Sequence, residues 1–288
     1  MDKKVATIAW GSFFWGIPAF LWQVLSFYVP LFFLLITSFV KHAPALKPAQ
    51  FSLEHYKALF DSIYISIFAR SFILASSTVL VCLLIAYPVA YYLVVKIKRF
   101  KTICFALLVL PFWTNFLLLV YAWYFLLENH GLVNNILLKI GLISQPIHMM
   151  NTQIAVYCGM FYCYLPFMLL PLYSTFERLD TQLLDASSDL GATNMQTFFR
   201  ITIPLTFSGI KTGALLVFIP AFGEFIVPAL LGGDKNMYIG SVITHYFLTV
   251  RNASMGSAFT CLATGVLAFL LLIVFTIHAF VTWKKQNV

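Results

Sequence analysis

The sequence predicts an all-α integral membrane protein with six transmembrane helices, forming a single transmembrane domain over residues 1–288. Two observations carry this prediction. The chain is 61% hydrophobic with a mean hydropathy of +0.90, and only 10% of its residues are charged, whereas soluble domains carry roughly 25%. The apolar residues also fall into long runs, and most basic residues lie at the edges of these runs. The net charge of +8 therefore fits a membrane protein, and we expect no nucleic-acid partner.

The first apolar run, Val5–Val40, is too long for a secretory signal, whose apolar core has about 7 to 15 residues. Trp10, Trp15 and Trp22 are residues typical of the membrane interface. We therefore expect an amphipathic lead-in and then one span, at about Pro18–Val40.

Five further runs are long enough to cross a bilayer, which needs roughly 20 residues. The predicted spans are Phe72–Val95, Ile103–Leu127, Ile154–Phe176, Ile210–Leu231 and Ala258–Thr282. Six crossings place both termini on one side. With a cytoplasmic N-terminus, eleven Lys and Arg residues lie inside and seven outside, out of 18. The cluster Lys96–Lys101 in a short loop favours the same orientation, because short loops weigh most. We expect both termini to be cytoplasmic.

Three external segments predict short amphipathic helices: Phe51–Phe60, Asn134–Ile143 and Ile239–Val250. Such helices can lie on the membrane surface and seal the interface. They can equally form an external rim on which a soluble partner docks, and the sequence leaves both interpretations open. The five cysteines have no spacing that suits a metal or a disulfide framework, so we expect neither a metal nor a cofactor in this chain.

A polar segment between the fourth and fifth spans, Leu183–Pro204, stands out from its apolar surroundings. Thr181–Leu190 predicts a short helix with Asp180 as its N-cap. Within it, Asp185 and Asp189 lie one turn apart.

The end of that helix and the start of the next are also signalled. Gly191 best tolerates the left-handed conformation at which helices stop. Asn194 can cap a second short helix, which Pro204 must end or kink. Two short helices at an angle make a rigid peg that can transmit force from a soluble motor. The alternative is an ordinary amphipathic loop.

Glu224 is predicted to be the one acidic residue well inside a span. A charge in hydrocarbon costs about 2.5 to 3.5 kcal/mol on insertion scales, so its carboxylate should face a cavity, a partner or water. Pro220, Gly223 and Pro228 loosen the helix around it enough for a gate. Glu224 and Gly223 are therefore candidates for a pathway or gate, and a gating or interface role is favoured over contact with a transported solute.

A second candidate lies in the third predicted span. Pro111 frees a backbone carbonyl, and Trp113, Thr114 and Asn115 add aromatic and polar groups. This composition fits a broken helix that lines a cavity, and aromatic faces attract organic cations. The alternative is an interfacial Trp belt beside a kink. A third candidate is Tyr162–Tyr173 in the fourth span, which is rich in Tyr, Phe and Met and is punctuated by Pro166 and Pro171. Kinked packing is its favoured interpretation.

The polar segment resembles the cytoplasmic coupling loop of permease subunits of binding-protein-dependent ABC importers. That pattern is Glu-Ala-Ala, three residues, Gly, nine residues, Ile, one residue, Leu-Pro. Three identities differ mildly, since Asp replaces Glu, Ser replaces the second Ala and Ile replaces Leu. The resemblance implies a type I permease fold with a coupling loop over residues 177–208. The matching positions are Asp185, Ala186, Ser187, Gly191, Ile201, Ile203 and Pro204, with Asp189 between them.

Four segments together resemble the spermidine/putrescine importer permeases, first-permease type, over nearly the whole chain. The resemblance implies that polyamines are transported. Related permeases that import oxyanions carry a similar Gly-Glu-Phe-like segment, so Glu224 does not decide the charge of the solute. Another organic cation, or an oxyanion, is the alternative. The segments are Pro111–Asn115, Leu165–Ser174, the coupling loop, and Ile219–Gly233.

The same resemblance implies partners: a second homologous permease subunit, a cytoplasmic ATPase dimer and a periplasmic or tethered substrate-binding protein, in a bacterial inner membrane. The chain lacks the Gly-x-x-x-x-Gly-Lys-Ser/Thr phosphate loop. We therefore expect ATP and Mg²⁺ to be bound by the ATPase, and no enzymatic site here. A secondary transporter would need more buried ionisable groups than Glu224. An intramembrane enzyme would need partners for His278, the one His clearly inside a predicted span.

Overall fold

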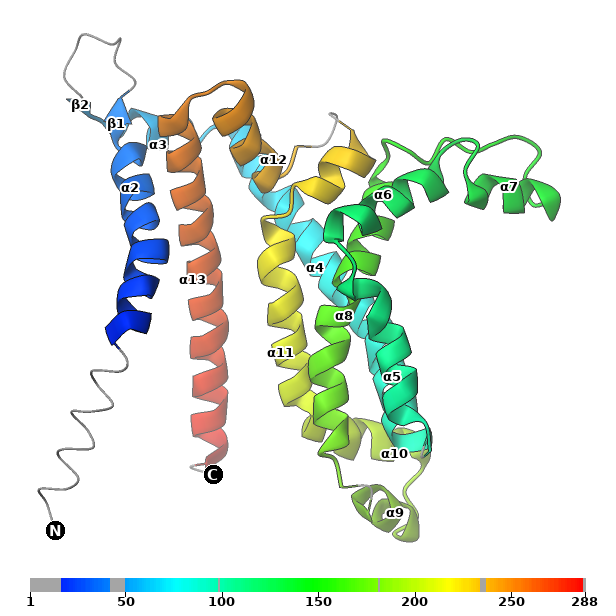
Figure 1. The fold of residues 1–288 in the computed structure, drawn as a ribbon. Coiled ribbons are helices and arrows are strands. Elements are labelled where there is room, and N and C mark those ends of the chain that lie inside the picture. The colour runs from blue at the N-terminus through cyan, green and yellow to red at the C-terminus, as the bar shows by residue number, and fades with distance from the viewer. Residues whose placement is uncertain (1–16, 42–49, 98, 181, 234–236, 287–288) are drawn as a thin grey trace, which may run out of the picture. The chain divides into compact units, whose positions relative to one another are not determined.

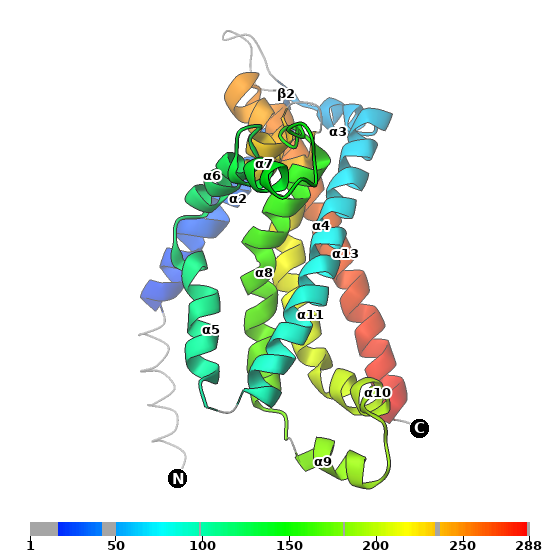
Figure 2. The same cartoon turned by 90° about the vertical axis from the view of Figure 1, so that its right-hand side faces the viewer.

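The computed structural model describes residues 17–41, 50–97, 99–180, 182–233 and 237–286, without the side chains of 277–286. Figures 1 and 2 show a predominantly helical chain. Within the described residues, six helices are long and apolar enough to cross a membrane. The predicted fold class is therefore confirmed, whereas the lead-in with Trp10 and Trp15 and the side chain of His278 lie outside the described residues. The six are Ile17–Ser38, Ser62–Lys96, Phe116–Lys139, Gln153–Glu177, Asn194–Phe222 and Ala253–Thr276, and Lys101–Trp113 is a shorter apolar helix.

By its internal contacts the chain divides into two compact units, residues 1–65 with 243–288 and residues 66–242. In the first unit, helix α2 (Val29–Ser38) follows a π-helical turn, η1 (Val24–Tyr28), and packs on α13 (Ala253–Gln286). The hydroxyl of Thr37 donates to that of Ser257 at 2.9 Å. The last helix begins five residues before the predicted Ala258, because Asn252 accepts a hydrogen bond from the amide of Met255 and so caps its start.

The predicted helix Phe51–Phe60 is shorter in the structure. Strand β1 (Val40–Lys41) pairs antiparallel with β2 (Gln50–Phe51), and the helix α3 covers Glu54–Ala58. Lys41 and Glu54 form an ion pair of 2.6 Å. Its hydrogen bond, aided by the lysine charge, lowers the pKa of the Glu54 carboxyl. The first residue of the predicted helix, Phe51, therefore lies in a strand.

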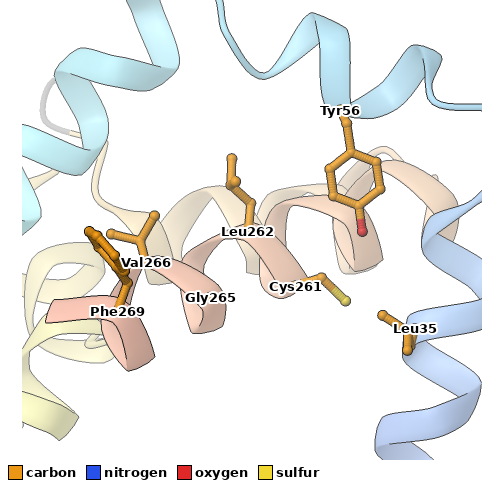
Figure 3. Close-up of a pocket in the computed structure, with 7 residues that line it drawn as sticks. All are labelled: Leu35, Tyr56, Cys261, Leu262, Gly265, Val266 and Phe269. Atoms are coloured by element: carbon orange, nitrogen blue, oxygen red, sulfur yellow. The ribbon is translucent and has the colours of Figure 1, made fainter. Parts of the chain in front are cut away.

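An apolar groove of about 410 Å³ runs along one face of α13 in the first unit (Figure 3). The Tyr56 side chain of α3 and Leu35 of α2 border it near Cys261, and Gly265 leaves space in its floor. The candidate pathway residues Trp113, Asn115, Gly223 and Glu224 belong to the second unit.

The second unit is built around two tightly packed helices, α8 (Gln153–Glu177) and α11 (Ile203–Phe222). Two glycines of α11, Gly209 and Gly213, permit this close approach. A Cβ at Gly209 would lie 2.5 Å from the Thr175 hydroxyl, and one at Gly213 would lie 2.6 Å from the Met168 sulfur. Four-residue spacing places both glycines on one helix face. The predicted fourth span, Ile154–Phe176, agrees with α8 to one residue at each end, and both internal prolines lie within this continuous helix.

Other helices surround this pair, and α4 (Ser62–Tyr91) begins ten residues before the predicted Phe72. Asp61 accepts a hydrogen bond from the Ile63 amide at 3.2 Å, which fixes the early start. Arg70 lies within this helix, and one charged residue near the end of a span is tolerated. The remaining elements are η2 (Tyr92–Lys96), α5 (Lys101–Val109), η3 (Leu110–Trp113), α6 (Phe116–Leu127), α7 (Leu132–Lys139), α9 (Gln182–Asp189), α10 (Asn194–Thr197), η4 (Phe198–Thr202) and η5 (Pro228–Gly232).

Helices α9 and α10 lie at one end of the second unit, and α7 lies at the opposite end (Figures 1 and 2). Helix α7 falls within the predicted segment Asn134–Ile143 apart from its first two residues. The buried Asn134 amide clamps it, donating to the carbonyls of Glu128 and Ile147 and accepting from the Ile147 amide. The predicted helix at Ile239–Val250 is present as α12 (Ile239–Thr244), continued by the π-helical turn η6 (His245–Thr249).

Candidate functional site

The predicted third span is broken at Thr114–Asn115. Pro111 lies in the 3-10 turn η3, and the backbone of Thr114 and Asn115 is extended. The Asn115 side chain accepts a hydrogen bond from the Leu117 amide at 2.8 Å and thereby caps α6. Trp113 is 86% exposed. The predicted helix break is confirmed, and Asn115 has a defined local role in it.

The predicted fifth span, Ile210–Leu231, is wrong at both ends. Helix α11 begins at Ile203 and ends at Phe222, with Gly223 as its C-cap, and a second short helical stretch begins at Ile226. Glu224 therefore lies in a break between two helical segments and not inside a continuous helix. Hydropathy cannot detect this break, because apolar residues flank it on both sides.

Glu224 caps the second stretch with its own carboxylate. Its Oε1 accepts hydrogen bonds from the amides of Phe225, Ile226 and Val227 at 3.0, 2.7 and 3.4 Å. These amides are donors that the start of a helix leaves without partners, and the helix dipole adds further stabilisation to a negative charge there. These hydrogen bonds therefore offset part of the free-energy cost of placing the Glu224 charge among apolar residues.

Tyr164 of α8 connects the two breaks. Its hydroxyl donates to Glu224 Oε2 at 2.5 Å. Its ring lies edge-on to Phe116, the first residue of α6, with centroids 6.4 Å apart. The structure therefore brings both candidate segments to one tyrosine, which is buried. Tyr164 lies in the third candidate segment, Tyr162–Tyr173, but sequence reasoning did not single it out, because nothing local distinguishes it from the other tyrosines of the chain.

The start of α12, at Ile239 and Gly240, also packs against the break at Gly223–Phe225. The Ile239 amide donates to the Ser71 hydroxyl of α4 at 2.9 Å. This places Gly240 against the break, where a Cβ would collide with the Gly223 carbonyl and lie 2.9 Å from the Glu224 carbonyl. The carboxylate at the break is therefore fixed by its cap, by a hydroxyl and by packed backbone.

Replacing Asn115 tests the importance of the first break. Asn115→Ala removes the α6 cap, at a typical cost of about 1 kcal/mol, and we expect uptake of the transported solute to fall roughly fivefold. Asn115→Ser keeps a capping oxygen and should retain near-normal uptake. Equal uptake in both variants, measured at equal membrane abundance, would show that the cap is dispensable.

The polar segment after α8 folds as two short helices, as predicted. The Asp180 carboxylate accepts from the Gln182 amide at 2.9 Å at the start of α9. Gly191 has φ +78°. The Gly191 amide donates to the Ser188 carbonyl at 2.9 Å and the Ala192 amide to the Ser187 carbonyl at 3.0 Å. These two bonds form the Schellman motif that ends a helix at a glycine.

The cap of the second helix is Thr193 and not the predicted Asn194. Thr193 and Gln196 form a complete capping box, in which each side chain accepts from the other residue's amide. Asn194 is the first helical residue. The sequence placed the cap one residue too late, since both residues are good N-caps.

Ser187 joins the two helices. Its hydroxyl lies 2.8 Å from that of Thr197 in α10, and Ser187 is buried. Asp185, Ala186 and Asp189 are exposed. Neither aspartate forms an ion pair with a residue that the structure describes. The segment therefore has a braced interior and a free outer face with two carboxylates.

Pro204 does not end the second helix. The chain continues from α10 through the π-helical turn η4 into α11, where Pro204 occupies the first turn. The wider π-helical turn accommodates a residue without an amide hydrogen. Ile201 lies in η4 and Ile203 begins α11, and both are partly buried. The peg is thus continuous with a membrane helix.

An aromatic cluster anchors this connection. Phe198 of η4 lies edge-on to Tyr87 of α4 with centroids 5.6 Å apart, and Tyr87 contacts Phe176 of α8 at 5.2 Å. The Tyr87 hydroxyl also lies 2.9 Å from that of Thr206 in α11. The connection between the polar segment and the membrane helices is therefore packed against α4, α8 and α11. These residues were not singled out from the sequence.

The outer surface of the two short helices carries exposed apolar side chains beside the carboxylates. Leu190 is 89% exposed and Met195 is 68% exposed. A cleft of about 840 Å³ opens between α9, α10 and the end of α4, with Lys96 and Asp185 among its lining residues. Exposed apolar side chains on a braced projection are typical of a protein interaction surface.

Comparison with protein families assigns the chain. The family described as "Binding-protein-dependent transport system inner membrane component" matches residues 83–284, which include both breaks and both short helices. The chain belongs to this family. It is thus a multi-pass membrane component of an ABC transport system. The polar segment Leu183–Pro204 predicted that this permease belongs to the family, and that prediction is confirmed.

Several proteins closely resemble this permease over most of its length. The spermidine/putrescine transport system permease protein PotB of Salmonella typhimurium is 42% identical over 88% of each chain. PotB of Escherichia coli K12 is 41% identical, over 88% of the permease and 92% of PotB. PotB of Haemophilus influenzae is 38% identical, over 93% and 94%.

Solved structures share the fold of the permease. A chain of a bacterial ABC transporter involved in the import of the acidic polysaccharide alginate superposes with a TM-score of 0.73 at 16% identity, over 96% of both chains. A chain of the MetNI methionine ABC transporter gives a TM-score of 0.54 at 16% identity, over 75% of the permease and 95% of that chain. At this identity the likeness shows the fold alone.

Proposed function

We propose that this chain is a permease subunit of an ATP-driven polyamine importer, which moves spermidine or putrescine by alternating access. The assignment of polyamines as the cargo rests on the 38–42% identity to spermidine/putrescine permeases over most of the chain. The exposed aromatic residue Trp113 and the carboxylate of Glu224 provide chemistry that suits an organic cation. Both belong to or adjoin the breaks that meet at Tyr164.

The polar segment over residues 177–208 is the coupling loop in this proposal. Asp185, Ala186, Asp189 and the exposed apolar residues of α9 and α10 form the surface that docks on a cytoplasmic ATPase. Gly191 and Ser187 keep the two short helices at a fixed angle, and Ile201, Ile203 and Pro204 lead into α11. ATP and Mg²⁺ are bound by that ATPase, which hydrolyses the nucleotide.

The transport cycle follows from linkage. Closure of the ATPase dimer on ATP moves the coupling loop, and the rigid helices connected to it tilt. The two breaks beside Tyr164 then open or close the pathway. In this arrangement Glu224 and Gly223 act at the gate, with Trp113 and Asn115 on the pathway. A second permease subunit supplies the other half, a binding protein delivers the cargo, and both termini lie in the cytoplasm.

The test is the ATPase activity of the reconstituted complex of both permeases, the ATPase and the binding protein. We expect spermidine or putrescine to stimulate ATP hydrolysis several-fold, and an oxyanion to have no effect. Stimulation by a different solute alone would reject the polyamine cargo and keep the importer mechanism. Uptake that continues without ATP but stops with an ionophore would instead indicate a secondary transporter.

A further inference from the structure

Helix α5 is attached to α8 by a small number of side chains. Of its nine residues, all of them described, one is buried, Val109. At its first residue, Lys101 Nζ lies 3.0 Å from Glu177 Oε1, at the last residue of α8. One turn further on, the Phe105 ring stacks on Tyr173, with centroids 3.9 Å apart and an interplanar angle of 19°.

These two contacts have the spacing of an antiparallel helix pair. Lys101 and Phe105 are four residues apart on α5, and Tyr173 and Glu177 are four apart on α8, so each pair shares one helix face. At the other end, Phe112 of η3 meets Tyr162 of α8, with centroids 5.0 Å apart. The segment from Lys101 to Phe112 is therefore held at both ends against one helix.

The two ends of the segment from Lys101 to Phe112 lie beside two different parts of the candidate site. Glu177 is the last residue of α8, where the coupling loop begins. Lys101 begins α5, and η3 leads from the other end of α5 to the break at Thr114–Asn115. The ion pair thus joins the end of α8 to the start of α5, and the other end of α5 leads to the break.

We propose that Lys101 and Glu177 are positioning residues whose ion pair transmits movement of the coupling loop to the first pathway break. The proposal rests on the coupling function proposed above and adds the route by which force leaves the loop. Such a route differs from the one through Phe198 and Tyr87, which leads to α4, α8 and α11.

The Lys101–Glu177 ion pair is exposed enough to solvent to break and re-form during a transport cycle. The side chains of Lys101 and Glu177 are 37% and 43% exposed, and ion pairs this open to solvent contribute little to fold stability. The hydrogen bond with Glu177 raises the pKa of the Lys101 ammonium. Breaking the pair therefore leaves the fold intact and changes the balance between transport states.

Charge reversal tests this proposal in the complete reconstituted complex. The variants are Lys101→Glu, Glu177→Lys and the two combined, with Arg99→Glu as a control that changes the charge of the same loop equally. Arg99 lies beside the Phe100 ring and forms no ion pair with a residue that the structure describes. The measurement is spermidine transported per ATP hydrolysed, together with the thermal stability of the solubilised complex.

We expect each single reversal to lower the transport per ATP about fivefold, as an exposed ion pair turned repulsive would, with unchanged thermal stability. The double reversal should restore it to within about twofold, and Arg99→Glu should match the wild type. Unchanged transport per ATP in both single variants, or no rescue in the double variant, overturns the proposal. Failure of spermidine to stimulate the wild-type complex would instead reject the proposed cargo, which separates the two hypotheses.

Discussion

Replacing Gly191 by valine will reduce cargo-stimulated ATP hydrolysis and uptake by at least tenfold, while membrane insertion stays normal. Gly191 ends α9 with φ +78°, a conformation that costs other L-residues about 1 to 2 kcal/mol and suits a β-branched residue worst. A Cβ at this position would meet nothing within 4 Å. The effect therefore comes from the backbone, because valine forces the Schellman turn to open and changes the angle between the two short helices.

Two variants separate this cause from others. Gly191→Asn adds a side chain but tolerates the left-handed conformation, so it should keep uptake within about twofold of the wild type. Gly141 ends α7 with φ +71° and also has nothing within 4 Å of a Cβ. Gly141→Val therefore imposes the same strain at the opposite end of the second unit, and should leave coupling intact. Normal uptake by Gly191→Val would remove the assignment of residues 177–208 as the coupling loop.

The features that could be predicted from the sequence are those whose physical cause is local. The end of α9 at Gly191 and its start beside Asp180 depend on residues within one helical turn, and both predictions are confirmed. The break at Thr114–Asn115 is also local, because Asn115 is a good N-cap that follows shortly after Pro111, where the helix is already weakened. The number of apolar spans follows from composition and length, although the predicted third span, Ile103–Leu127, is divided between the shorter helix Lys101–Trp113 and the span Phe116–Lys139.

The features that were missed depend on contacts between distant residues. Tyr164 acquires its role from Glu224, 60 residues away, and no pattern in the chain selects it among 14 tyrosines. The carboxylate of Glu224 looked like an isolated charge inside a span, because hydropathy averages over the three-residue break that it caps. The Lys101–Glu177 pair likewise joins two helix ends that are adjacent only after folding.

Glu224→Ala should lower the maximal rate of uptake more than tenfold, and Glu224→Gln less than threefold. Alanine removes the cap of three amides and leaves the Tyr164 hydroxyl without its acceptor. Losing a cap costs about 1 kcal/mol and leaving a buried polar group unsatisfied costs about 1 to 3 kcal/mol. Glutamine keeps an acceptor oxygen for the amides, and its amide nitrogen can donate to the Tyr164 oxygen. The geometry of the break is then preserved although the charge is lost.

This pair of variants separates the two roles that a carboxylate at this position can have. If Glu224 holds the gate by geometry, Gln resembles the wild type, and Tyr164→Phe alone lowers the maximal rate with little change in KM. If Glu224 instead binds a cationic cargo directly, Gln and Ala are equally impaired, and both raise the KM for spermidine. Initial uptake rates over a range of spermidine concentrations decide between them. We expect the first pattern, because three amides and a hydroxyl already occupy the two oxygens of the carboxylate, which leaves little acceptor capacity for direct hydrogen bonds from a cationic cargo.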